Sequence, residues 1–259
     1  MATVIAVTNQ KGGVGKTTTS INVAYFLSKA GKKTLLVDFD PQGNATSGLG
    51  VDKSSLELAM TDVINGQQPL EKIIIQTEHK NLFLAPTTSV LANTEVELTQ
   101  LERRFSRLKM TLAPVLANYD YIIIDSPPSL SLLTVNGLIA ARYVLLPVQA
   151  EFYALEGLGQ LLETMKLIRK GMNPSLELLG VVPTMMDSRT TLSNQVHAEI
   201  TKHFPEKVFK TTIPRNIRLA EAPSHGLPIG VYDRFSKGSR SYKSLTKEII
   251  ERTSNEELL

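Results

Sequence analysis

The chain of 259 residues contains no cysteine, which excludes disulfides, thiolate metal sites, iron–sulfur ligation and a cysteine nucleophile. No apolar run reaches the roughly 20 residues that a membrane helix needs, and the first residues lack the basic stretch of a signal peptide. Hydrophobic residues make up 42% and charged residues 20% of the chain, as in a folded globular protein rather than a disordered chain or a fibre. We therefore expect a soluble, cytoplasmic protein.

Positive charge is concentrated in one part of the chain. The formal net charge is only +3, yet residues 202–252 hold eleven Lys or Arg against five Asp or Glu. A local excess of this kind attracts phosphate backbones, although many charged surfaces are simply solvated. Taken alone, the charge leaves nucleic-acid binding open.

Short runs rich in Val, Ile and Leu alternate with longer stretches of helical period, a pattern typical of βαβ units around a parallel sheet. The predicted strands are 4–8, 34–38, 82–85, 121–125, 143–147, 178–183 and 208–213. The predicted helices are 17–30, 94–116, 130–141, 155–170, 191–204 and 242–253. No repeat or linker interrupts the series. We expect one α/β domain over residues 1–259, with a mostly parallel, twisted sheet of seven or eight strands and helices on both faces.

Two helices carry additional signals. Gly31 follows the helix predicted at 17–30, where glycine suits the left-handed conformation that ends a helix. In the helix predicted at 94–116, apolar residues recur at helical spacing, so this stripe should pack in the core. The residues expected on its opposite, solvent-facing side are Arg103, Arg104 and Arg107.

A glycine-rich loop follows the first predicted strand and leads into the first predicted helix. It comprises Lys11, Gly12, Gly13, Val14, Gly15, Lys16, Thr17 and Thr18. Its glycines let backbone N–H groups turn inward around phosphates, and the positive end of the following helix points at them. A P-loop in this strand-to-helix context predicts nucleotide binding.

Two lysines flank the glycines of this loop. Lys16 is the expected partner of the β- and γ-phosphates, and the Thr17 hydroxyl is a ligand for Mg²⁺. Gln10 stands where the ordinary P-loop pattern has glycine, and Lys11 is an additional lysine. The match is therefore to the deviant form of the motif.

Aspartates lie at the ends of two predicted strands. Asp38 and Asp40 follow one another closely at the end of the second strand, and Asp125 ends a run of four apolar residues. Ligands of open α/β sheets bind at the carboxyl ends of the strands, so these side chains should approach the phosphates. We expect Asp125 to hold Mg²⁺, Asp38 to support the magnesium shell and Asp40 to position the attacking water. The alternative for Asp38 and Asp40 is that they only cap a turn.

These motifs resemble those of the ParA/MinD group of deviant Walker ATPases, and most closely those of the Soj-type ParA proteins that partition DNA. The resemblance rests on the segments 11–18, 38–48, 125–128, 147–157, 213–216 and 219–223. They span nearly the whole chain and keep the family's order. The resemblance implies a Mg²⁺-dependent ATPase that converts ATP to ADP and phosphate.

The resemblance also implies a dimer that ATP assembles. In this family two subunits enclose the nucleotides, and Lys11 of one subunit would reach the nucleotide of the other, where it would act like an arginine finger on the departing γ-phosphate. Pro214 and Asn216 should line the adenine pocket, with Arg215 beside it. Proline offers the base an apolar wall, and the asparagine amide can read its edge.

Basic residues of the C-terminal half bind DNA across the dimer in this family. Arg189 and Arg218 stand where family arginines bind DNA, while Lys237, Arg240 and Lys243 either widen the patch or form a solvated helix face. Contacts to phosphates imply binding to double-stranded DNA that ignores sequence and weakens with salt. A ParB-like, centromere-binding partner would stimulate the slow hydrolysis and release the protein from the nucleoid.

Two other members of this group fit poorly. The nitrogenase iron protein needs cysteine ligands, which this chain lacks. MinD binds membranes through a terminal amphipathic helix with a basic face, whereas residues 251–259 are acidic. We expect Leu245, Ile249 and Ile250 to pack in the core, and no membrane partner.

Two further functions stay open. A related ATPase that distributes a protein cargo, such as carboxysomes or chemoreceptor clusters, would share the site chemistry. Carboxysome positioners often lack the lysine present here as Lys11, which favours DNA partition. A biosynthetic ATPase with an incidental basic patch would not bind DNA. Because the first predicted strand begins almost at once, we also expect no helix-turn-helix domain before the P-loop and no operator-specific repression.

Overall fold

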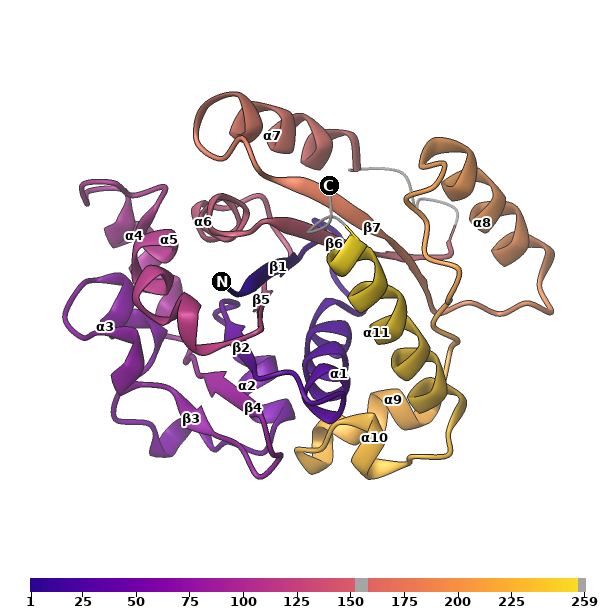
Figure 1. Cartoon of the computed structure of the whole chain (residues 1–259), viewed down its shortest axis with the longest axis horizontal. Coiled ribbons are helices and arrows are strands. Elements are labelled where there is room, and N and C mark those ends of the chain that lie inside the picture. Colours follow the sequence, from indigo (N-terminus) through magenta and orange to yellow (C-terminus); the bar gives the residue numbers. More distant parts are fainter. Residues whose placement is uncertain (152–157, 256–259) are drawn as a thin grey trace.

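One sheet organises the protein in a computed structural model, which describes residues 1–151 and 158–255. Its strands are β1 Thr3–Val7, β2 Thr34–Asp38, β3 Ile75–Gln76, β4 Leu82–Ala85, β5 Tyr121–Asp125, β6 Tyr143–Gln149 and β7 Glu177–Thr184. They lie in the order β3, β4, β2, β5, β1, β6, β7 (Figure 1). All pairs are parallel except β3 with β4. The predicted mostly parallel sheet is confirmed.

Helices cover both faces of this sheet. The α-helices are α1 Lys16–Lys29, α2 Asn44–Gly48, α3 Met60–Ile64, α4 Leu91–Leu98, α5 Arg107–Leu112, α6 Leu132–Ala140, α7 Leu158–Gly171, α8 Thr191–His203, α9 Ile217–Glu221, α10 Ile229–Tyr232 and α11 Lys237–Asn255. Short 3₁₀ turns lie at Lys53–Ser55, Leu70–Lys72, Ala113–Asn118 and Ala222–His225. Figure 1 shows α1 and α11 on one side of the sheet and α5, α6 and α7 on the other.

Alternate residues of each central strand pack into two separate hydrophobic cores, one on each face of the sheet. In β1, Val4 and Ala6 join a cluster with α3 to α8, whereas Ile5 and Val7 join a cluster with α1, α9, α10 and α11. A strand buried on both faces must be apolar at every position, which is why these strands read as continuous apolar runs. The predicted burial of Leu245 and Ile249 is confirmed, and Ile250 packs against the second core.

The strand register brings the predicted site residues to one edge. Asp38 at the end of β2 lies opposite Asp125 at the end of β5, and Asp125 in turn lies opposite Val7 at the end of β1. The P-loop leaves β1 at the same edge. The crevice that binds ligands in open α/β sheets is therefore formed here by strands far apart in sequence.

The prediction of a strand at 208–213 is wrong. This segment makes only isolated bridges, one between Val208 and Val181 and one just beyond it. The reason lies in α11, because the backbone N–H groups of Lys210 and Thr211 donate to the carboxylate of Glu248 at 2.9 and 2.8 Å. The Glu248 carboxylate thus accepts hydrogen bonds from backbone N–H groups that, in a strand, would donate to the neighbouring strand.

The prediction of a single helix at 94–116 is also wrong. The chain forms α4, leaves the helical conformation and starts again at α5, with Arg103 at a left-handed φ of 54° in between. Asn136 of α6 stabilises this break, because its amide donates to Arg104 O at 2.7 Å and accepts from Leu108 N at 3.2 Å. The predicted apolar stripe is still buried or half-buried.

The arginines of this segment differ from one another. Arg103 and Arg104 are exposed, as predicted. Arg107 is only half-exposed, since its guanidinium donates to Ile64 O at 2.9 Å. The expectation that all three simply face water is therefore wrong for Arg107.

The other helix predictions are confirmed within a few residues at each end. Gly31 has the predicted left-handed conformation, with a φ of 84°. α11 begins five residues before its predicted start at 242. The predicted start of the helix at 155–170 lies outside the described residues. The short elements β3, α2, α3, α9 and α10 were not predicted, because two to five residues carry too little periodicity.

Candidate nucleotide site

The P-loop is held in place by hydrogen bonds to β6 and β7, which lie on one side of β1. Gly15, the N-cap of α1, has a φ of 88°, a conformation that only glycine adopts without steric cost. The Asn9 side chain donates to Pro147 O of β6 at 2.7 Å. The Thr184 hydroxyl of β7 donates to Val14 O at 2.8 Å. The loop conformation is therefore fixed before any ligand binds.

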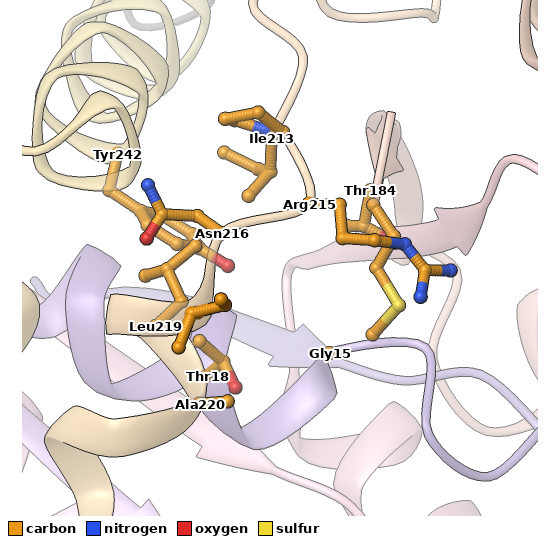
Figure 2. Close-up of a pocket in the computed structure, with 12 residues that line it drawn as sticks. Gly15, Thr18, Thr184, Ile213, Arg215, Asn216, Leu219, Ala220 and Tyr242 are labelled. Carbon is orange, nitrogen blue, oxygen red and sulfur yellow. The ribbon is translucent and has the colours of Figure 1, made fainter. Parts of the chain in front are cut away.

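Two cavities adjoin at this loop. A polar one of about 330 Å³ is lined by Gly12, Gly13, Gly15, Lys16, Thr17, Thr18, Asp40, Gln42, Asn44, Pro128 and Met185. A mostly apolar one of about 350 Å³ is lined by Gly15, Thr18, Thr184, Met185, Ile213, Pro214, Arg215, Asn216, Ile217, Leu219, Ala220 and Tyr242 (Figure 2). Gly15, Thr18 and Met185 line both. The polar cavity suits the phosphates of a nucleotide, and the apolar cavity beside it suits a flat base.

Lys16 is a buried lysine at the floor of the polar cavity. Its ammonium donates to Lys11 O at 3.0 Å. Burial lowers the pKa of Lys16, and the charges of Asp125 and Asp40 oppose this by favouring the ammonium form. The site thus keeps a cation close to two carboxylates.

Asp125 is fully buried at the end of β5. Its Oδ1 accepts from the Ser20 hydroxyl of α1 at 2.8 Å, while Oδ2 accepts no hydrogen bond from the described residues. Burial, and next the neighbouring charge of Asp38, raise the pKa of Asp125 to about 8. A buried carboxyl with an unpartnered oxygen fits a cation, because a positive charge would favour its ionised form.

Asp38 has a different environment from Asp125. Its Oδ2 accepts from both the backbone N–H and the hydroxyl of Thr46, each at 2.7 Å. Burial raises the pKa of Asp38 to about 6. Asp38 therefore fixes the loop after β2 and the start of α2, and offers less to a magnesium shell than Asp125 does.

Asp40 lies in the wall of the polar cavity and is nearly buried. Its Oδ1 accepts from Gln42 N at 3.0 Å, so it also shapes the turn. The interpretations of Asp40 as a turn residue and as a site residue are thus compatible. Gln42 and Asn44 share this wall and were not among the predicted site residues.

The predicted adenine wall lies in the apolar cavity. Pro214, Arg215 and Asn216 line it, and Tyr242 lies across the cavity from Arg215 (Figure 2). The carbonyl oxygen of the Asn216 side chain accepts from Arg218 N at 2.8 Å and caps α9. The NH₂ group of Asn216 remains available to donate to a ligand.

Lys11 lies on the outer side of the P-loop. Its ammonium is 3.6 Å from the carboxylate of Glu151, and the guanidinium of Arg215 is 3.7 Å from the same carboxylate. Glu151 lies in the segment 147–157 that carries the resemblance, but no role was predicted for it from the sequence. The structure brings the P-loop, the end of β6 and the base cavity together at this residue.

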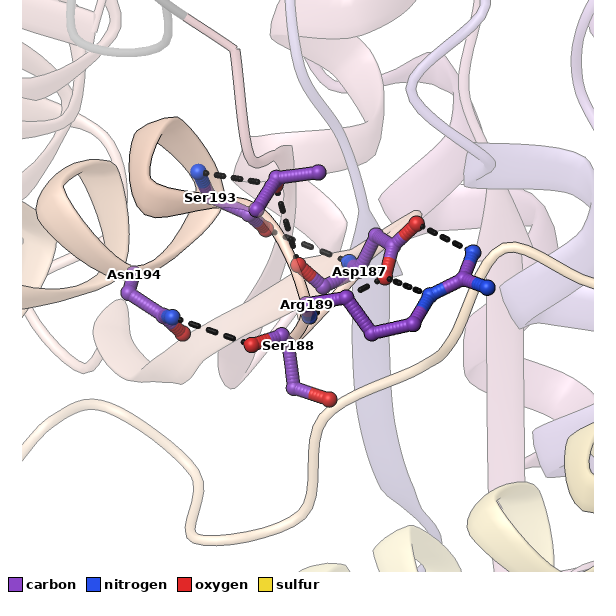
Figure 3. Close-up of polar contacts among 6 residues, drawn as sticks. Asp187, Ser188, Arg189, Ser193 and Asn194 are labelled. Atoms are coloured by element: carbon purple, nitrogen blue, oxygen red, sulfur yellow. Dashed lines mark hydrogen bonds and ion pairs between the residues drawn. The ribbon is translucent and has the colours of Figure 1, made fainter.

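Arg189 and Arg218 both lie on the surface, and both are paired with acids. Arg189 makes two hydrogen bonds to the Asp187 carboxylate, at 2.9 and 2.7 Å (Figure 3). These bonds lower the pKa of Asp187 to about 2. Arg218 contacts Glu221 at 2.9 Å and Asp233 at 3.7 Å. Neither arginine presents an uncompensated charge.

Two further cavity residues were missed in the sequence. Met185 follows β7 with a positive φ of 52°, which is unusual for a non-glycine residue and places it between the two cavities. Its position after a strand was the same signal that identified the aspartates. The Tyr242 hydroxyl lies 3.1 Å from the Thr19 hydroxyl, a contact across 223 positions that no local pattern predicts.

None of the helices in the described ranges 1–151 and 158–255 has the length and apolar character to cross a membrane.

Known proteins match this chain over nearly its full length. A protein family with the description AAA domain matches residues 2–178. The chain is 53% identical to the sporulation initiation inhibitor protein Soj of Bacillus subtilis (strain 168), over 96% of this chain and 98% of that protein. It is 48% identical to the chromosome partitioning protein ParA of Myxococcus xanthus (strain DK1622), over 96% of this chain and 88% of that protein.

Solved structures share the fold. Cobyrinic acid a,c-diamide synthase from Mycobacterium smegmatis, with bound ADP and magnesium, has a TM-score of 0.87 at 36% identity over 98% of this chain and 96% of that one. An ATP complex of McdA from Cyanothece has a TM-score of 0.87 at 24% identity over 96% of each chain, which shows the fold alone. The match of residues 2–178 and the 53% identity over nearly the whole chain lead to one conclusion: this chain belongs to the AAA-domain family and, within it, to the ParA/Soj chromosome-partitioning ATPases.

Proposed function

We propose that ATP and Mg²⁺ convert this chain into a dimer that holds DNA, and that hydrolysis releases it. The observation that carries the proposal is the pair of adjoining cavities, a base-sized apolar one and a polar one that contains Lys16. The relatives named as chromosome partitioning proteins and the related structure with ADP and magnesium support it.

In this proposal the base enters the apolar cavity against Pro214, and the phosphates enter the polar one. Backbone N–H groups of the P-loop and the start of α1 meet the phosphates with positive dipoles. Lys16 adds a full charge. Its ammonium now donates to Lys11 O, so the phosphates would take over a donor that the loop already satisfies.

Mg²⁺ would be held by the Thr17 hydroxyl and by Asp125, directly or through water. The buried, unpartnered Oδ2 of Asp125 is the group that fits a cation best. The described residues contain no group of three or more His, Cys, Asp or Glu side chains that could hold a metal ion by themselves, so phosphate oxygens and waters would complete the shell. When bound, the ion neutralises charge that develops on the phosphates.

Asp40 is our candidate for orienting the water that attacks the γ-phosphate. It lies in the wall of the polar cavity, and its backbone is held by a tight turn. A carboxylate in that place accepts a proton of the water and directs its lone pair at phosphorus. Replacement of Asp40 should therefore slow hydrolysis more than it weakens ATP binding.

Dimerisation would add Lys11 of one subunit to the nucleotide site of the other. The Lys11 side chain is 38% exposed, so it can reach across an interface once its ammonium leaves the carboxylate of Glu151. A second cation at the γ-phosphate lowers the barrier to its departure. Nucleotide state and dimer state would then act as one switch.

DNA would bind to the basic surface of the C-terminal part. Arg189, Arg215 and Lys237 line one hollow of about 520 Å³, and Lys237, Arg240 and Lys243 are exposed. Phosphates compete well with the acidic partners of the surface arginines at low salt, because a duplex offers many charges at once. We propose that Arg189 and Arg218 contact DNA, and that the ATP-bound dimer resides on the nucleoid.

A ParB-like partner would end the cycle by stimulating hydrolysis. We expect hydrolysis by the chain alone to be slow, so that the partner sets when the dimer leaves DNA. The alternative, transport of a protein cargo by the same switch, would keep DNA binding and change only the partner. A biosynthetic ATPase would lack DNA binding altogether.

The two P-loop lysines provide the first test. Lys16→Ala should abolish ATP binding, whereas Lys11→Ala should bind ATP and stay monomeric in sedimentation with a non-hydrolysable analogue. Lys29→Ala, at the far end of α1, is the matched control. Equal loss of ATP binding in both P-loop variants would refute the role of Lys11 in trans.

The basic surface provides the second test. The double variant Arg189→Glu, Arg218→Glu should keep the ATP-bound dimer and lose retention on unrelated DNA duplexes. Wild-type binding should fall steeply as salt rises, because each phosphate contact releases counterions. Salt-insensitive binding, or unchanged retention by the double variant, would show that DNA binds elsewhere.

A further inference from the structure

Glu151 follows β6 and is held in a defined place beside the P-loop. Its neighbour Ala150 donates from the backbone to Thr184 O at 3.1 Å, and Glu151 N donates to Gln149 O at 2.8 Å. The side-chain amide of Gln149 also donates to Oε1 of Glu151. The carboxylate is therefore oriented by its own strand end, although 46% of the side chain is exposed.

Two cations of the nucleotide site converge on this carboxylate. Lys11 Nζ lies 3.6 Å from Oε2, and Arg215 Nη2 lies 3.7 Å from Oε1. Within residues 1–151 and 158–255, no other carboxylate lies within 4 Å of either cation. Oε2 of Glu151 thus lies near the P-loop, and Oε1, which also accepts from the Gln149 amide, lies near Arg215 of the base cavity.

Two hydrogen bonds hold the backbone of Lys11 in the nucleotide-free protein. Lys11 N donates to the Asn9 side chain at 3.0 Å, and Lys11 O accepts from the ammonium of Lys16 at 3.0 Å. The long side chain of Lys11 is the part of the residue with most rotational freedom. For Lys11 to reach a nucleotide in a second subunit, its ammonium must first leave Glu151.

We propose that Glu151 is a positioning residue that holds Lys11 on its own subunit until a second, nucleotide-bound subunit arrives. The inference rests on the proposed role of Lys11 in trans. A triphosphate carries more negative charge than one carboxylate, so it draws Lys11 across the interface only when ATP is bound. Glu151 thereby opposes dimerisation in the absence of nucleotide and makes the switch depend on the full triphosphate.

The size of the effect follows from the exposure of the pair. A half-exposed ion pair shifts an equilibrium by about 1.4- to 5-fold. A symmetric dimer requires two such pairs to open, so the effect on the dimer dissociation constant is about 2- to 25-fold. It shrinks as salt screens the pair.

The test variant is Glu151→Gln, which keeps the shape of the side chain and removes its charge. Sedimentation with a non-hydrolysable ATP analogue and Mg²⁺ should give a dimer dissociation constant about 2- to 25-fold lower than that of the wild type at low salt. Glu163→Gln removes an equally simple ion pair with Lys166 on the outer helix α7 and should change nothing.

A second measurement reports on Lys11 in the free monomer. Competitive labelling with an amine-reactive reagent, quantified by mass spectrometry, should label Lys11 faster in Glu151→Gln than in the wild type, with Lys166 as the internal reference. A purely structural role of Glu151 would change labelling across the whole chain.

The outcomes separate the inference from the proposed function. If the wild type dimerises and Glu151→Gln dimerises equally or more weakly, or if Lys11 labelling is unchanged, the positioning role is refuted while the proposed switch stands. If the wild type stays monomeric with saturating analogue, the role of Lys11 in trans fails, and the inference fails with it.

Discussion

Asn216 combines two tasks that substitutions can separate. Its side-chain oxygen caps α9 by accepting from Arg218 N at 2.8 Å, which leaves its NH₂ group to donate to a ring nitrogen of the base. Asn216→Asp keeps an acceptor for the cap and loses the donor. Asn216→Ala loses both. One hydrogen bond contributes about 0.5–1.5 kcal/mol, so both variants should bind ATP about 2- to 13-fold more weakly.

Stability should distinguish the same two variants. Loss of an N-cap costs about 0.5–2 kcal/mol, so urea unfolding of the nucleotide-free protein should show this loss for Asn216→Ala and little or none for Asn216→Asp. ATP affinity is measured by titration calorimetry. Unchanged affinity in both variants would refute a contact between Asn216 and the base. Equal destabilisation of both would refute the capping role.

Three further predictions concern carboxylates. The pKa of Asp125 is raised from 3.8 to about 8 in the folded protein, so the native state binds this proton more tightly than the unfolded chain. Without nucleotide and Mg²⁺, the free energy of unfolding should therefore fall as pH rises from 6.5 to 8, by at most about 1.4 kcal/mol per pH unit. This window lies above the pKa of Asp38. The variant Asp125→Asn should show a smaller dependence on pH in urea unfolding. Asp40→Ala should bind ATP, remain on DNA and lose hydrolysis, whereas normal phosphate release would contradict its role. Asp187→Asn should remove the acidic partner of Arg189 and tighten DNA binding about 2- to 5-fold at low salt. Fluorescence anisotropy measures this affinity. Weaker binding by the variant would show that Asp187 orients Arg189 for DNA.

Local patterns predicted most of the architecture. Runs of three or four apolar residues identified β2, β4 and β5 with their observed bounds, because a strand covered on both faces is mostly apolar. The P-loop was identifiable for a similar reason, since its glycines and lysines are consecutive and their chemistry depends little on distant residues. The aspartates at the strand ends followed from the general position of ligand sites in open α/β sheets.

The errors occurred where a distant side chain replaced a local hydrogen bond. Glu248 takes the donors of the segment predicted as a strand at 208–213, and Asn136 stabilises the break in the helix predicted at 94–116. These particular contacts of Glu248 and Asn136 span 28 or more positions of the chain. No period in the sequence encodes such a contact, because periodicity reports only which face of an element is buried.

The sequence by itself determined that the chain forms a parallel α/β sheet with a phosphate-binding loop, since both follow from consecutive residues. Only the tertiary structure decided how the carboxylates differ: Asp38 is bound by Thr46, Asp125 keeps a buried oxygen free, and Glu151 lies against Lys11. The physical reason is that the chemistry of an acidic side chain depends on its burial and on the charges and donors around it. Those neighbours come from strands and loops that meet only in the folded protein.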